Sequence, residues 1–229
     1  MKKRNISALL AKSVKDLQDS MSQAPRNNVC ATNTDIVIEG FPRSGNTFTL
    51  DMLHVLREGA ETNLKIAHHT HRIENILIGR RLDKPIVTLI RNPEDAILSY
   101  MIFSGKPADF AAQRYFNFYN AILQLKPLPI VLDFQTVVTD FNKVVDVVNE
   151  AAGSSIRKST DLKADGALAH ARAERRARDK HGDLYTQRIG APNEDREKIK
   201  RERRASVAAF LAGNPEIQDV YERVIAHAV

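Results

Sequence analysis

Two glycines and an arginine follow an apolar segment in a pattern that could bind an anion. Residues 35–39 predict a buried strand, and Gly40, Arg43 and Gly45 lie in the short loop after it. A helical pattern starts at residue 46, so the free N–H groups of the loop and of the first helical turn would point at one spot. The loop therefore predicts a phosphate site, with an ordinary strand-to-helix turn as the alternative.

The same loop nearly matches the pattern that nucleoside triphosphatases use. Gly40, Gly45 and Thr47 stand where that pattern requires them, but Asn46 occupies the position of its lysine. The cation lies three residues upstream instead, as Arg43. Because the lysine contacts the transferring phosphoryl group in such enzymes, a kinase or triphosphatase interpretation loses its main residue.

A second apolar strand also leads into a possible anion site. Residues 85–90 are β-branched and apolar, and Arg91 follows them directly. Asn92 and Pro93 are typical of a helix N-cap and first position, and Ser99 comes two turns later. The arginine fork and the serine hydroxyl together suit a phosphate monoester. A surface arginine beside a capped helix is the alternative.

These two motifs carry a family resemblance. The loop at residues 41–48 resembles the 5′-phosphosulfate loop of sulfotransferases, usually Pro-Lys-Ser-Gly-Thr-Thr-Trp, and residues 91–99 resemble their 3′-phosphate motif. The resemblance covers residues 35–153 and implies a P-loop-like sulfotransferase fold. It implies the donor 3′-phosphoadenosine-5′-phosphosulfate (PAPS), the product 3′-phosphoadenosine 5′-phosphate (PAP), and a small-molecule or glycan acceptor with a hydroxyl or amine. The donor-binding residues that it implies are Pro42, Arg43, Ser44, Gly45, Asn46, Thr47, Phe48, Arg91 and Ser99, with Arg188 and Gly190 from a later Arg-Ile-Gly segment.

The chain departs from the family pattern at three positions. Arg43 replaces the usual lysine, Asn46 a threonine and Phe48 a tryptophan. An arginine can bridge the sulfate and the leaving phosphate oxygen with a planar fork, but it barely deprotonates. We therefore expect Arg43 to act in catalysis as an electrostatic clamp on developing charge.

Residues 64–72 predict another strand, and three histidines lie in its second half. If this segment stays extended, His69 and His71 share a face and His68 points away. Sulfotransferases carry a catalytic histidine in a Lys-Thr-His sequence after the second strand, so the resemblance implies His71 as general base, with His69 as the alternate. A metal site is the other possibility, but the chain offers no cysteine partner and no His-Glu-x-x-His pattern. The transfer scheme itself requires no metal.

Charge is concentrated late in the chain. Residues 157–204 hold 15 Lys and Arg against 9 Asp and Glu, a surplus that equals the net charge of +6 of all 229 residues. We expect residues 157–190 to form a basic, mobile lid that orders on binding. A basic nucleic-acid-binding module is an alternative, although no recognised motif accompanies the charge, which argues against nucleic acid as a partner.

The remaining patterns predict one α/β domain over residues 1–229, a parallel sheet with helices on both faces. Residues 1–33 read as a helical extension with one amphipathic helix at 5–21, residues 128–132 as a fourth strand, and Asn214 and Pro215 as the start of the last helix.

No run of 18 apolar residues or signal core occurs, and Cys30 is the one cysteine, so we expect a cytoplasmic protein without disulfides or a membrane span. Four aromatic residues could line an acceptor pocket or belong to the core: Phe103, Tyr115, Phe118 and Tyr119.

Overall fold

A computed structural model of the chain describes residues 6–58, 63–182 and 194–229. Its centre is a four-stranded sheet in the order β2-β1-β3-β4, and every neighbouring pair is parallel. The α/β class with a parallel sheet is thereby confirmed. The strands are β1 (Ile36–Gly40), β2 (Ile66–His68), β3 (Ile86–Ile90) and β4 (Ile130–Asp133).

The strand order reverses direction between β1 and β3. From β1 the chain moves to β2 on one side and then to β3 on the other, so the connections diverge at the β1 and β3 pair. Val37 of β1 lies opposite Ile86 of β3, and Gly40 lies opposite Leu89. In open parallel sheets the crevice at such a switch point, beyond the carboxyl ends of the strands, is the usual binding place. Both predicted anion motifs follow these two strands.

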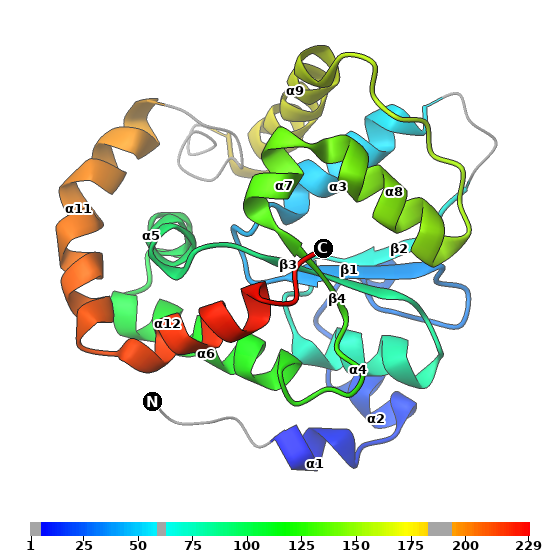
Figure 1. Ribbon diagram of the computed structural model, residues 1–229, viewed down its shortest axis with the longest axis horizontal. Coiled ribbons are helices and arrows are strands. Elements are labelled where there is room, and N and C mark those ends of the chain that lie inside the picture. Colours follow the sequence, from blue (N-terminus) through cyan, green and yellow to red (C-terminus); the bar gives the residue numbers. More distant parts are fainter. Residues whose placement is uncertain (1–5, 59–62, 183–193) are drawn as a thin grey trace.

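Helices cover both faces of the sheet, as Figure 1 shows. Ile36 and Ile38 belong to the apolar core beneath one helical layer, and Val37 belongs to the core on the opposite side. One layer holds α3 (Asn46–Leu56) and α8 (Phe141–Ala152), and the other holds α4 (Ile73–Arg81), α6 (Ala108–Ile122) and α12 (Pro215–Ile225). The predicted last helix is confirmed, with Pro215 in its first turn.

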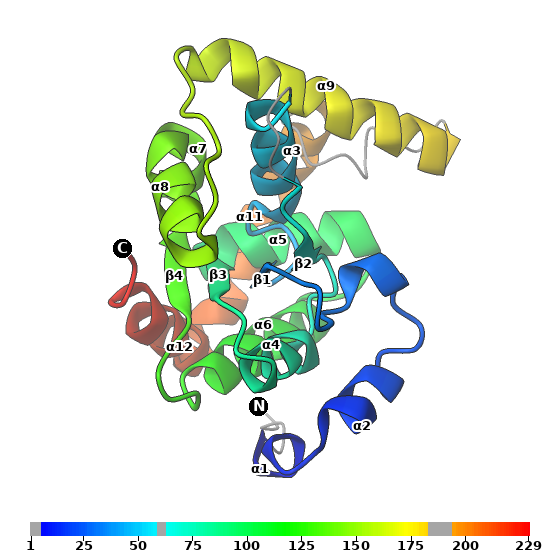
Figure 2. The ribbon, with the colours of Figure 1, turned by 90° about the vertical axis from the view of Figure 1, so that its right-hand side faces the viewer.

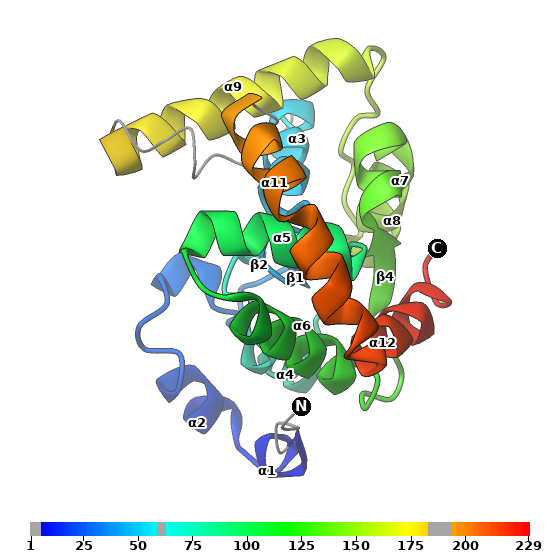
Figure 3. The ribbon, with the colours of Figure 1, turned by 90° about the vertical axis from the view of Figure 1, so that its left-hand side faces the viewer.

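Four further helices surround the edge of the sheet that carries the motifs: α5 (Pro93–Ser104), α7 (Phe134–Thr139), α9 (Leu162–His181) and α11 (Glu194–Ala212). Figure 2 shows α9 lying across α3, where buried Asp51 accepts two hydrogen bonds from Arg176 and lies 3.7 Å from Arg172. Figure 3 shows α11 running across α5 towards α12. Much of the expected lid is thus the helix α9, held to α3 by ion pairs.

The N-terminal extension differs from its prediction. One helix over 5–21 is wrong, because α1 (Ile6–Leu10) ends before α2 (Val14–Asp19) begins. Ser13 starts the second helix: its hydroxyl accepts from the Asp16 amide, and the Asp16 carboxylate accepts from the Ser13 amide, a reciprocal capping box. In the described ranges no helix combines the length and apolar character that a bilayer crossing needs.

Candidate functional site

The loop after β1 has a backbone shape that few residues adopt. Arg43 and Gly45 both have positive φ, 75° and 93°. A side chain at Gly40 would place its Cβ 2.5 Å from the carbonyl oxygen of Leu89, so only glycine fits beside β3. A strained non-glycine residue such as Arg43 is typical of loops that hold a ligand. The loop ends at Asn46, where α3 begins. The N–H groups in the first turn of α3 have no acceptor within the helix.

Several side chains of the motif are packed against the protein interior and support the loop. The Ser44 hydroxyl is buried 3.2 Å from the Tyr119 hydroxyl, and the Asn46 amide nitrogen donates to the Phe41 carbonyl at 3.0 Å. Pro42 is buried, and Phe48 packs against the rings of Phe141 and His170. Among the predicted loop residues, Arg43 and Thr47 therefore remain as the polar side chains that are partly exposed at the site.

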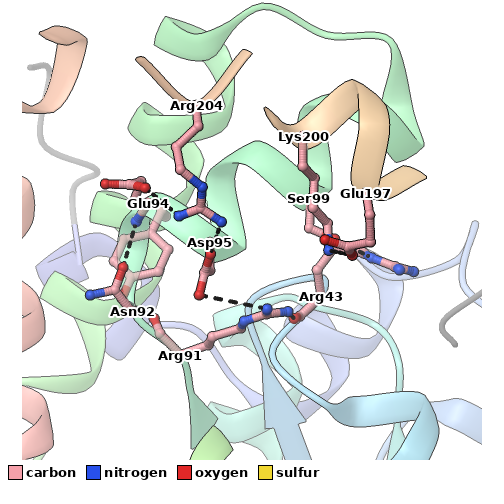
Figure 4. Close-up of polar contacts among 10 residues, drawn as sticks. Arg43, Arg91, Asn92, Glu94, Asp95, Ser99, Glu197, Lys200 and Arg204 are labelled. Carbon is pink, nitrogen blue, oxygen red and sulfur yellow. Dashed lines mark hydrogen bonds and ion pairs between the residues drawn. The ribbon is translucent and has the colours of Figure 1, made fainter. Parts of the chain in front are cut away.

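The second motif meets the first at the edge between β1 and β3 (Figure 4). Asn92 caps α5 by accepting from the Glu94 amide at 3.0 Å, which starts the helix directly after Arg91. Ser99 lies two turns along α5, and its hydroxyl accepts from Arg43 Nε at 3.1 Å. Arg91 Nη1 donates to the carbonyl oxygen of Arg43 at 3.2 Å. The structure thus brings Arg43, Arg91 and Ser99 together.

Arg91 is held in place before any ligand arrives. Its guanidinium stacks 4.0 Å from the centre of the Phe134 ring, and its backbone carbonyl accepts from the Tyr115 hydroxyl at 2.8 Å. Burial lowers the pKa of Arg91, and nearby Asp95, 3.8 Å away, opposes this change. Arg91 Nε is buried with no hydrogen-bond partner within the described ranges. A preorganised cation with a spare donor is well suited to an anionic ligand.

Sequence reasoning missed the contribution of α11. Arg204 pairs with Glu94 and Asp95 at the start of α5, and Lys200 pairs with Glu197 beside Ser99 and Arg43 (Figure 4). The Arg204 pairs join segments more than 100 residues apart, so local patterns could not predict them. The predicted late donor residues, Arg188 and Gly190, lie outside the described part of the chain.

The predicted strand is present as β2, but the extended backbone expected through His71 is wrong. β2 ends at His68, and His69 and His71 adopt left-handed backbone angles with φ of 54° and 52°. His68 therefore does not point away: its Nδ1 lies 2.9 Å from Nδ1 of His69, and the His69 and His71 ring centres are 5.5 Å apart. All three rings form one cluster next to the β1 loop.

Hydrogen bonds distinguish the two candidate bases. His71 Nδ1 lies 2.8 Å from the Gly40 carbonyl, which can only accept, so the proton sits on Nδ1 and Nε2 keeps its lone pair. His69 uses both ring nitrogens, Nε2 with the Thr47 hydroxyl at 3.0 Å and Nδ1 with His68. Burial lowers the pKa of His71 to about 4 and that of His69 well below 6.5, so both rings are neutral at pH 7. This geometry favours His71 as a proton acceptor.

Acid should destabilise the folded protein through this cluster. The pKa values of His68 and His71 fall to about 4 on folding, so between pH 4 and the ordinary 6.5 the unfolded chain binds more protons. The stability present above pH 6.5 is therefore lost as the pH falls through this window. At pH 5, unfolding should take up about two more protons in the wild type than in a His68→Gln, His71→Gln double variant.

Urea unfolding between pH 5 and 7 measures this difference as a slope of unfolding free energy against pH. Equal slopes for the wild type and the double variant would contradict the assignment of buried, neutral rings.

Three of the four aromatic candidates for an acceptor pocket belong to the core. Tyr115, Phe118 and Tyr119 are buried, and the Tyr119 hydroxyl donates to the Leu89 carbonyl at 2.8 Å. Phe103 is partly exposed and lies 5.4 Å from the Arg43 guanidinium, so it is the one of the four next to the anion motifs. In the part of the chain that the structure describes, no three His, Cys, Asp or Glu side chains are grouped to hold a metal ion.

Comparison with known proteins adds no assignment to this geometry. A scan against protein-family models finds no match to the chain, and a search of curated proteins finds none either.

Proposed function

We propose that the chain is a PAPS-dependent sulfotransferase. The observation that carries this proposal is the meeting of the two anion motifs, in which Arg43 donates to Ser99 and Arg91 donates to the backbone of Arg43. A donor with phosphate groups at both the 5′ and 3′ positions needs two such sites side by side. Both motifs lie at the single edge between β1 and β3, with neutral histidines beside it, and this arrangement supports the proposal.

The donor would bind across these two motifs. Backbone N–H groups at the start of α3, Thr47 and the Arg43 guanidinium would hold the 5′-phosphosulfate, helped by the positive end of the helix. Arg91 and Ser99 would hold the 3′-phosphate through a charged fork and a hydroxyl. Because Arg43 touches Ser99, the two halves of the donor site would be ordered together.

Transfer would proceed in one in-line step. His71 Nε2 takes the proton from the acceptor hydroxyl or amine, whose oxygen or nitrogen forms a bond to the sulfur. The bond between sulfur and the 5′-phosphate oxygen breaks, and its electron pair stays on that oxygen as PAP leaves. Arg43 and the start of α3 stabilise the charge that develops there. Holding donor and acceptor in line supplies much of the rate enhancement.

A kinase is the main alternative, and one contact weighs against it. Asn46, at the position of the missing lysine, turns its amide towards the Phe41 carbonyl and supports the loop. An asparagine side chain is also uncharged, so it cannot supply the cation that a triphosphate needs at this position. For the basic segment, the ion pairs of Arg176 and Arg204 give a structural use that requires no nucleic acid.

Incubation with [35S]PAPS tests the proposal, using alcohol, phenol, amine and saccharide acceptors and a no-acceptor control for slow transfer to water. We expect PAP and labelled product to form in equal amounts, and His71→Ala to slow the formation of both by at least about 100-fold. A parallel incubation with [γ-32P]ATP and Mg²⁺ supplies the contrast. Phosphoryl transfer from ATP, with no PAP formed from PAPS, would contradict the proposal.

A further inference from the structure

A buried carboxylate lies behind the histidine turn. Glu39 is the last residue but one of β1 and is fully buried in the sheet. A carboxylate inside a sheet is costly unless each oxygen accepts hydrogen bonds. Burial raises the pKa of Glu39, and its hydrogen bonds to Thr70, Asn75 and His71 oppose this change.

Within the described residues, Glu39 accepts four hydrogen bonds, three from the histidine turn and one from Asn75 of α4. Oε1 accepts from the Thr70 amide at 2.9 Å, the Thr70 hydroxyl at 2.5 Å and the Asn75 side chain at 2.9 Å, while Oε2 accepts from the His71 amide at 3.0 Å. A carboxylate can accept about four hydrogen bonds in total, and here they divide three to one between its two oxygens. Asn75 in turn accepts from the Cys30 amide at 2.7 Å, which ties the N-terminal extension to the same network.

The turn needs this support because its backbone is unfavourable. His69 and His71 are both left-handed, a conformation that residues other than glycine rarely adopt. Glu39 binds the N–H groups of Thr70 and His71, the residues that a change of backbone angle would displace. The neighbouring Gly40 carbonyl accepts from the His71 ring. Consecutive residues of β1 thus hold the backbone and the ring of one histidine.

We propose that Glu39 is a positioning residue, whose four accepted hydrogen bonds hold the left-handed turn so that His71 Nε2 faces the acceptor. This role rests on the proposed sulfotransferase function, in which His71 is the general base. Because Glu39 is fully buried, it would touch neither donor nor acceptor. Its loss should therefore reduce turnover while leaving the donor site between β1 and β3 intact.

Glu39→Gln is the test variant, because it preserves size but places an NH2 group against one of the four donors. We expect kcat to fall by about 30-fold, in the range of a lost hydrogen bond to a charged group, with KM for PAPS within about twofold. The matched control is Glu74→Gln, which removes another buried glutamate that pairs with Arg72. It should keep kcat within about twofold, and an equal loss in both variants would overturn the positioning role.

A spectroscopic readout separates this inference from the proposed function. The 15N shifts of the His71 ring should report the Nδ1–H tautomer in the wild type and a mixture of tautomers in Glu39→Gln. Unchanged ring shifts in a folded Glu39→Gln would overturn the inference even if no sulfuryl transfer is found. Absent transfer in the wild type, with the shift change present, would instead overturn only the proposed function.

Thr70→Val keeps the test decisive if Glu39→Gln does not fold. It deletes the hydroxyl that donates to Glu39 at 2.5 Å and retains the Thr70 amide bond. We expect kcat to fall by about fivefold, together with a smaller change in the same ring shifts. Wild-type values of both quantities would overturn the role of Glu39.

Discussion

Arg91→Ala is expected to weaken PAP binding by about 100-fold, while 5′-AMP binding changes by no more than about threefold. The difference between the two ligands is the 3′-phosphate, which the proposal assigns to Arg91 and Ser99. Because Arg91 is stacked on Phe134 and bonded to the Arg43 carbonyl, its fork is oriented before the ligand binds. Little ordering entropy would then oppose its contacts. Titration calorimetry with each ligand measures both constants.

Two control variants make this prediction specific. Arg91→Lys keeps the charge without the planar fork and should show an intermediate loss. Arg80→Ala removes an arginine at the end of α4, which donates to the Pro127 carbonyl, and should leave both ligands unaffected. Equal losses for PAP and 5′-AMP in Arg91→Ala would mean that Arg91 supports the loop and does not bind the 3′-phosphate.

His71→Ala is expected to lower kcat by at least about 100-fold and to leave the dissociation constant of PAP within about twofold. The acceptor proton would have no base, whereas the donor contacts come from other residues. The lone pair on His71 Nε2 follows from the bond of Nδ1 to the Gly40 carbonyl. Single-turnover kinetics and calorimetry on the same preparation separate the two effects.

His69→Ala is the matched comparison, since it removes a ring from the same cluster. His69 binds Thr47 and His68, so its loss should disturb the loop and reduce kcat by only about tenfold. A larger loss in His69→Ala than in His71→Ala would transfer the role of base to His69.

Local patterns predicted the elements and most of the motif positions. The β-branched runs became β1 and β3 because they are buried on both faces, and Asn92 and Pro93 start α5 as their residue types favour. Strand alternation with helices was enough to predict a parallel sheet and to place Arg43 and Arg91 at one edge. The Ser13 and Asp16 spacing was a readable signal for the break in the N-terminal extension, and it was missed.

Long-range contacts determined what the sequence could not predict. The histidine segment has a strand-like pattern, but Glu39 supplies hydrogen bonds that stabilise a left-handed turn there. Phe134 lies under Arg91 only because β4 pairs with β3, and Arg204 reaches Asp95 only because α11 crosses α5. None of these neighbours is close in sequence, so no local pattern contains them.

The most direct test of the account is calorimetry of PAP, 5′-AMP and ATP binding to the wild-type protein, with and without Mg²⁺. We expect PAP to bind at least about 100-fold more tightly than 5′-AMP and to do so without Mg²⁺, because the paired sites recognise both phosphates. ATP should bind weakly under either condition. Equal affinities for PAP and 5′-AMP, or tight binding of ATP that requires Mg²⁺, would contradict the proposed donor site.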